Sequence, residues 1–165
     1  MGFVQTAIFS SGEPADFYNL EHAVGRAANN RPDDVKIVQY LLAALNFDLA
    51  VDGICGPKTQ KALTQYQTML RSRGFSILVD GRIDRTKGGR AIGSISHTVY
   101  TIIWINQHVK TTNPSAWTAL PQLVFLKPAE LVDPEANDYI EVDAPQQTSP
   151  RDPGRTPTSA STRAR

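Results

Sequence analysis

The side chains best suited to catalysis in this sequence are one cysteine and three histidines. Cys55 stands in a predicted tight turn, while His22, His97 and His108 are far apart in sequence. A nucleophilic set of Cys55, one histidine and Asp80 can be drawn, but the turn supplies no glycine-rich loop or helix N-terminus to activate the thiol. Two histidines eleven positions apart, with no acid or thiol nearby, are a poor metal-ligand pattern. We therefore expect no enzymatic activity, no metal site and no cofactor.

Composition excludes further classes of function. Seventeen basic and sixteen acidic residues give the 165-residue chain a formal charge of +1, which provides no general attraction to nucleic acid. A single cysteine excludes an internal disulfide framework. No apolar run approaches the length of a membrane span, and the first nine residues lack the basic residues of a signal peptide.

An Asp-Gly turn occurs twice, 28 positions apart. Residues 51–54 read VDGI and residues 79–82 read VDGR. Aspartate can bond to its own backbone two residues on, and glycine tolerates positive φ, so both segments are predicted turns. After the first turn, Gly56 and Pro57 predict a helix start, because proline lacks only an N–H that is unpaired there anyway.

Apolar spacing predicts three helices around these turns. The first covers residues 33–45, the second 57–73, and the third 98–109, where length favours a helix over a strand. The apolar face of the first helix comprises Val35, Val38, Leu41, Leu42 and Leu45. That of the second comprises Ala62, Leu63, Tyr66, Met69 and Leu70. Gly74 is placed to end the second helix in a left-handed conformation.

Extensions are expected on both sides of this helical domain, which we place at residues 31–112. Residues 1–30 are predicted to be an irregular extension with one short strand at 3–9. Residues 113–145 form a proline-rich extended segment, in which 123–126 and 139–142 are possible edge strands. Eight of the eleven prolines follow residue 112. The tail, residues 146–165, is predicted to be disordered.

The pattern around the first turn resembles the peptidoglycan-binding domain family, small three-helix modules often attached to cell-wall hydrolases. It consists of Asp34-Val35, Val38-Gln39 and Leu41-Leu42, then VDGI with Gly56, Pro57 and Thr59, then Ala62 and Tyr66-Gln67. The resemblance covers about residues 33–85. It departs at Cys55, where the family usually has a bulky apolar residue, and at the second turn, which lacks Gly-Pro. The expected fold class is mainly α: a three-helix bundle with Asp-Gly turns and irregular N- and C-terminal extensions.

The resemblance implies a shallow binding groove near the first turn. The candidate ligand-binding residues are Gln39, Tyr40, Asp52, Lys58, Lys61, Tyr66 and Gln67. The lysines would pair with stem-peptide carboxylates, and the amides and tyrosines would supply hydrogen bonds and a flat wall. Each has a structural alternative: Asp52 as a turn residue, Tyr66 as a core residue, and the lysines as exposed helix cations.

Two functions remain open. The first is a non-catalytic, bacterial or phage-encoded module that binds peptidoglycan in the cell envelope or periplasm, reached without a classical signal peptide. The second is a cytoplasmic or particle-associated adaptor in a phage-tail-like or secretion assembly, which docks a protein partner through residues 113–145. Neither involves nucleic acid or a membrane span.

Overall fold

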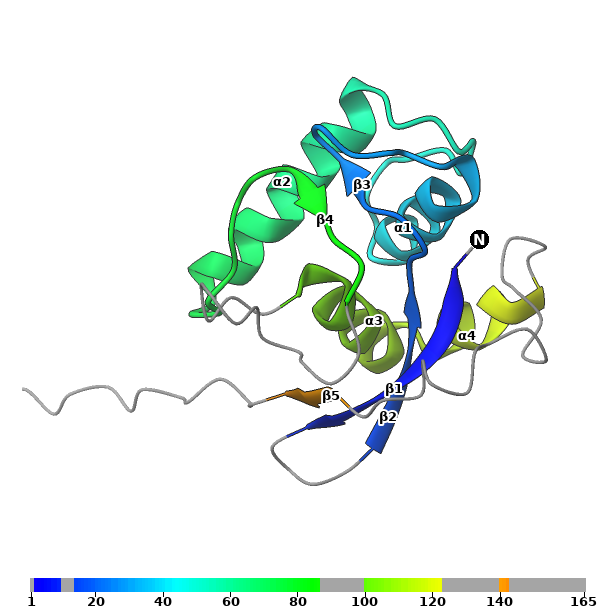
Figure 1. Cartoon of the computed structure of the whole chain (residues 1–165), viewed down its shortest axis with the longest axis vertical. Helices are drawn as coiled ribbons and strands as arrows, with labels where there is room; N and C mark the ends of the chain where they lie inside the picture. The colour runs from blue at the N-terminus through cyan, green and yellow to red at the C-terminus, as the bar shows by residue number, and fades with distance from the viewer. Residues whose placement is uncertain (1, 10–13, 87–99, 123–139, 143–165) are drawn as a thin grey trace, which may run out of the picture.

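The structure is a computed structural model that describes residues 2–9, 14–86, 100–122 and 140–142. It is mainly helical, as predicted (Figure 1). The helices are α1 (Pro32–Ala44), α2 (Pro57–Ser72), α3 (Thr101–Thr112) and α4 (Pro114–Ala119), followed by the short 3-10 helix η1 (Leu120–Gln122). The bounds of α1 and α2 lie within one residue of the predicted ones. Helix α3 begins and ends three residues later than predicted.

The described part of the N-terminal segment holds three strands, which corrects the prediction of an irregular extension with one short strand. It contains β1 (Phe3–Phe9), the predicted strand, and β2 (Pro14–Asn19), which pairs antiparallel with it. β5 (Ile140–Val142) joins the other edge of β1 in parallel, within the segment predicted at 139–142. A second, two-stranded sheet pairs β3 (Val24–Gly25) with β4 (Arg82–Ile83).

The N-terminal segment is part of the hydrophobic core. Phe17, Leu20 and Val24 are fully buried together with residues of α1, α2 and α3. The side-chain amide of Asn106 on α3 accepts a hydrogen bond from the backbone N–H of Tyr18 at 2.8 Å and donates one to its carbonyl at 3.0 Å. Long-range contacts of this kind have no periodic signature, which is why the sequence pattern missed them.

The start of the predicted extended segment, residues 113–145, is instead helix α4. Asn113 caps it by accepting a hydrogen bond from the N–H of Ala116 at 3.2 Å, and Pro114 occupies the first helical position. The Trp117 ring packs on Tyr18 at a centroid distance of 4.9 Å. The helix is thereby tied to β2. The predicted strand at 123–126 and the predicted disordered tail at 146–165 lie outside the described residues.

Residues 31–56 and 59–84 are two copies of one helix-and-turn unit, which we call the first and second copies. The two helices end at positions 44 and 72, and each is followed by a left-handed residue, Asn46 at φ 66° and Gly74 at φ 90°. Phe47 and Phe75 then donate backbone hydrogen bonds to Leu42 and Leu70 at 3.1 and 3.2 Å. The 28-residue spacing of the two turns is thus the repeat length of a structural duplication.

Candidate functional site

Gln39 organises the first Asp-Gly turn from within α1. Its side-chain N–H group donates hydrogen bonds to Asp52 Oδ1 at 2.8 Å and to the carbonyl of Ile54 at 3.1 Å, and its oxygen accepts the N–H of Gly53 at 2.9 Å. It also bonds Thr59 Oγ1 at 3.1 Å. Gln39 is only 1% exposed, so its amide is committed to the turn and has almost no surface for a ligand.

Asp52 completes the same turn. Its Oδ1 accepts the N–H of Ile54 at 2.8 Å. The pKa of Asp52 is lowered, chiefly by this backbone hydrogen bond and then by the Gln39 amide. The residue itself is exposed. Asp52 therefore acts as a turn residue, the structural alternative considered for it.

Gln67 has the same role in the second copy. Its N–H group donates to Asp80 Oδ1 at 3.0 Å and to the carbonyl of Arg82 at 2.7 Å, and its oxygen accepts the N–H of Gly81 at 2.8 Å. These three bonds repeat the bonds of Gln39 to Asp52, Ile54 and Gly53, with every residue 28 positions later in the chain. Gln67 is likewise 1% exposed.

The two candidate tyrosines also serve the fold. The Tyr40 hydroxyl donates to the carbonyl of Ala116 at 2.9 Å and so ties α1 to α4. Tyr66 is 0% exposed, and its hydroxyl has no hydrogen-bond partner among the described residues. Burial raises the pKa of Tyr66, and the His108 ring stacks on it at a centroid distance of 6.0 Å. Tyr66 thus has no accessible ring face for a sugar.

The candidate lysines lie on α2, which carries an open groove along its outer side. The groove has a volume of about 670 Å³ and is lined by Arg26, Pro57, Gln60, Lys61, Thr64, Gln65, Thr68, Met69 and Ser72. We call it the α2 groove. Of the seven residues predicted from the sequence, Lys61 lines it; Lys58 is exposed on the same helix outside this lining.

Arg26 reaches the α2 groove from the turn after β3. Its backbone N–H donates to the carbonyl of Gly81 at 3.0 Å. Gly25, at φ +117°, allows this approach, since a Cβ there would lie 2.2 Å from the same carbonyl. Sequence reasoning missed Arg26, because its partner in the fold lies more than fifty positions away.

The polar groups of the groove are unequal in their free hydrogen-bonding capacity. Thr64 and Thr68 donate their hydroxyl protons to the helix carbonyls of Gln60 and Thr64, at 3.0 and 2.8 Å. Ser72 does the same to Met69 at 2.8 Å. Each hydroxyl oxygen keeps lone pairs that can accept a hydrogen bond, while the cations and glutamine amides supply donors.

The other reactive groups show no catalytic arrangement among the residues described. Burial raises the pKa of the Cys55 thiol, so the thiolate is disfavoured. No group of three or more histidine, cysteine or acidic side chains in the described ranges could hold a metal ion. Within the same ranges, no helix has the length and apolarity needed to cross a membrane.

Comparison with known families assigns the helix-and-turn region. Residues 31–86 match the family model described as "Putative peptidoglycan binding domain". No curated protein and no solved structure matches the chain. The matched segment contains α1, both Asp-Gly turns and all of α2. The family resemblance predicted from the turn pattern is therefore confirmed as a match between residues 31–86 and this family model.

Proposed function

We propose that this protein binds peptidoglycan without catalysing a reaction, and that the α2 groove is its contact surface. The observation that carries the proposal is the family match over residues 31–86, which indicates peptidoglycan binding and association with the cell wall. Apart from Arg26, the residues that line the α2 groove belong to that segment, and the groove combines cations, amides and hydroxyls with the apolar side chains of Pro57 and Met69. This mixture suits a glycopeptide, which presents hydroxyls, amides and carboxylates.

The proposal moves the centre of the site from the first turn to α2. Gln39, Gln67 and Tyr66 are committed to turns and core, and none of them lines the α2 groove. Lys61 lines the α2 groove and is the strongest of the candidates predicted from the sequence. Lys58, one helical turn earlier and exposed, stays a predicted contact at the edge of the site.

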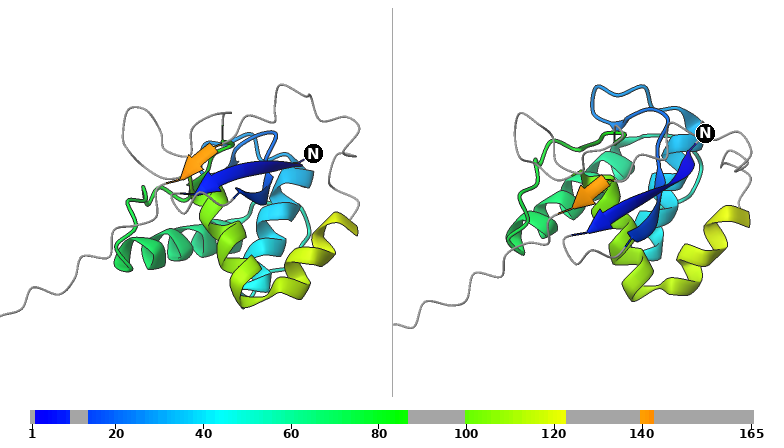
Figure 2. Two further views of the ribbon diagram at one scale, coloured as in Figure 1. Left: turned by 90° about the horizontal axis from the view of Figure 1, so that it is seen from below. Right: turned by 60° about the horizontal axis from the view of Figure 1, so that its bottom comes forward.

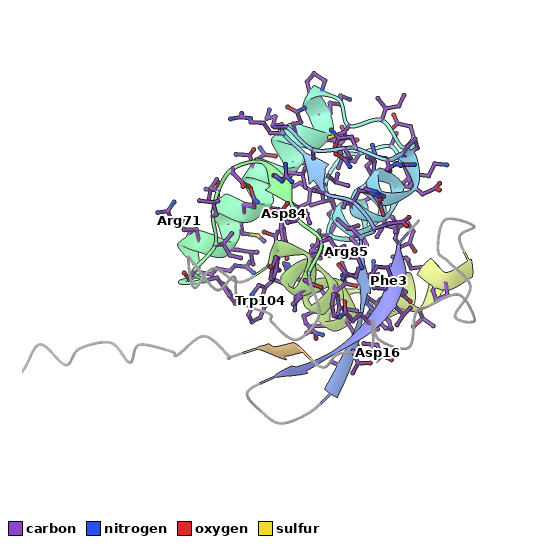
Figure 3. All side chains as sticks on the ribbon, in the orientation of Figure 1. Phe3, Asp16, Arg71, Asp84, Arg85 and Trp104 are labelled. Atoms are coloured by element: carbon purple, nitrogen blue, oxygen red, sulfur yellow. The ribbon has the colours of Figure 1, made fainter. Side chains whose placement is uncertain are left out.

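Co-sedimentation with isolated peptidoglycan sacculi tests the proposal. The full chain should bind saturably, and Lys61→Gln combined with Gln65→Ala should weaken binding about tenfold or more. Arg71→Gln is the matched control, because Arg71 is an exposed α2 cation outside the groove lining that projects outward (Figure 3). Absence of binding by the full chain would overturn the proposal, and equal binding by all variants would exclude the α2 groove.

The adaptor alternative draws support from a different surface. Ile54 and Leu78 are 67% and 61% exposed, and they lie on the loops beside the two turns, outside the α2 groove. Exposed apolar side chains of this size are common contacts in protein interfaces. Under this alternative, Ile54→Ser with Leu78→Ser would abolish a protein complex and leave sacculus binding unchanged. If the protein only binds peptidoglycan, no protein complex should depend on Ile54 and Leu78.

A further inference from the structure

We infer that the α2 groove recognises the peptide stem of the wall, held in extended form with a free carboxylate between Arg26 and Lys61. This inference rests on the proposed function and specifies which part of the polymer is bound. Three features of the groove lead to it: the distribution of charge, the row of acceptors, and the side chains that are missing from its lining.

Positive charge gathers in the N-terminal half of the groove. Lys61 is in the second turn of α2, and Arg26 is anchored to Gly81, which lies so close to the helix that a Cβ there would be 2.9 Å from Thr64 Oγ1. The positive end of the α2 dipole points the same way, and the first turn of α2 has no acidic residue. No carboxylate is among the described residues that line the groove. This half therefore favours an anionic group.

A line of hydrogen-bond acceptors continues along the helix from this charged half. The hydroxyl oxygens of Thr64 and Thr68 are four residues apart, which corresponds to about 6 Å along the axis of α2. Alternate N–H groups of an extended peptide repeat every 6.6 to 6.8 Å, roughly the same distance. An extended peptide can thus present alternate N–H donors to these two oxygens while its carboxylate lies at the cations.

The lining is poorly suited to a glycan strand. Sugar rings are commonly bound through their apolar faces on exposed aromatic side chains. The described residues that line the α2 groove include no aromatic side chain, and Tyr66 on the same helix is 0% exposed. The groove chemistry therefore favours the peptide over the glycan.

Chemically altered sacculi test this inference with the full chain. One sample is intact, one has its carboxylates converted to amides with carbodiimide and ethanolamine, and one has its peptides removed by an amidase that leaves the glycan. We expect binding to fall at least tenfold on both altered samples. Lys61→Gln and Arg26→Gln should each lower binding to intact sacculi severalfold. On amidated sacculi, each variant should bind as weakly as the unaltered chain does. Arg71→Gln should behave as the unaltered chain on all three.

The two levels of the proposal fail in different ways. Full binding to the peptide-free glycan would overturn the peptide inference and leave peptidoglycan binding intact. Full binding to amidated sacculi would overturn the role of the carboxylate. Absence of binding to intact sacculi would overturn the proposed function itself. Thermal unfolding of each variant establishes that a loss of binding is not a loss of folding.

Discussion

The two copies of the helix-and-turn unit use the same helical face in opposite ways. In the first copy, Ile37 and Leu41 on α1 are fully buried, and α4 is bonded to this helix through Tyr40 and through Ala44, whose carbonyl accepts from Asn113 at 3.3 Å. Adding 28 to the α1 positions 37, 40, 41 and 44 gives Gln65, Thr68, Met69 and Ser72, all of which line the α2 groove. The views agree that α2 and α4 lie on opposite sides of the molecule (Figures 1 and 2).

The two copies also differ in net charge. Residues 31–56 contain two basic and four acidic residues, whereas residues 59–84 contain four basic and two acidic residues. The first copy has a largely apolar helix face packed against described parts of the chain, whereas the equivalent face of the more basic second copy is largely polar and lines the α2 groove. A duplication can thus keep one copy as scaffold and free the equivalent face of the other for a ligand.

The largest loss of stability is expected from a substitution at Gly25, where the N-terminal segment contacts the second copy. Gly25→Ala would place a methyl group 2.2 Å from the carbonyl oxygen of Gly81, at a φ of +117°. We expect a loss of about 3–5 kcal/mol in the free energy of unfolding, measured by chemical denaturation. Gly56→Ala is the control, since nothing lies within 4 Å of a Cβ there, and it should cost less than about 1 kcal/mol. Equal effects would contradict the close approach of the two strands.

The duplication predicts matching effects for the two buried glutamines. Gln39→Leu leaves the N–H of Gly53 without its partner, and Gln67→Leu does the same to the N–H of Gly81. Each should lower the free energy of unfolding by about 2–3 kcal/mol, the usual cost of unpaired buried polar groups. Gln65→Leu, at an exposed position of the same helix, should change it by less than about 0.5 kcal/mol. A large difference between Gln39 and Gln67 would show that the second turn is not an equivalent structure.

Exchanging residues between the copies tests the contrast of faces directly. Gln65→Ile with Thr68→Tyr gives the α2 groove the residues of the first copy, and we expect at least about a tenfold loss of sacculus binding with little change in stability. The reverse change, Ile37→Gln, buries an amide in the core and should destabilise the fold by about 2–3 kcal/mol. Unchanged sacculus binding by the double variant would remove the α2 groove from the mechanism.

The smallest expected effect is a pH dependence of stability that arises from His108, whose ring stacks on Tyr66 of the second copy. Burial, with a smaller contribution from the charge of Arg73, lowers the pKa of His108 below its usual value near 6.5. Since the unfolded chain binds the proton more readily, neutral His108 contributes stability to the folded state. This contribution is complete above about pH 6.5 and is lost as the pH falls toward the lowered pKa of His108. In denaturation curves at pH 7.5 and 5.5, His108→Gln should lose less stability than the unaltered chain. Parallel pH profiles for the two proteins would contradict this.

The sequence by itself determined the local structure. Helices α1 and α2, their ends and both Asp-Gly turns follow from apolar spacing, proline and glycine placement, and these local signals also carried the family resemblance confirmed over residues 31–86. They succeeded because helix starts and tight turns depend on residues that are neighbours in the chain.

Only the tertiary structure decided which surfaces remain open. Tyr40 and Thr68 hold equivalent positions, yet Tyr40 is bonded to α4 and Thr68 lines a groove. Among the described residues, α4 returns to α1 and no helix covers the equivalent face of α2. Arg26 joins the groove because β3 pairs with β4, a contact across more than fifty residues. The number of partners that cover a helix face depends on the path of the whole chain, and no local pattern in the sequence encodes that path.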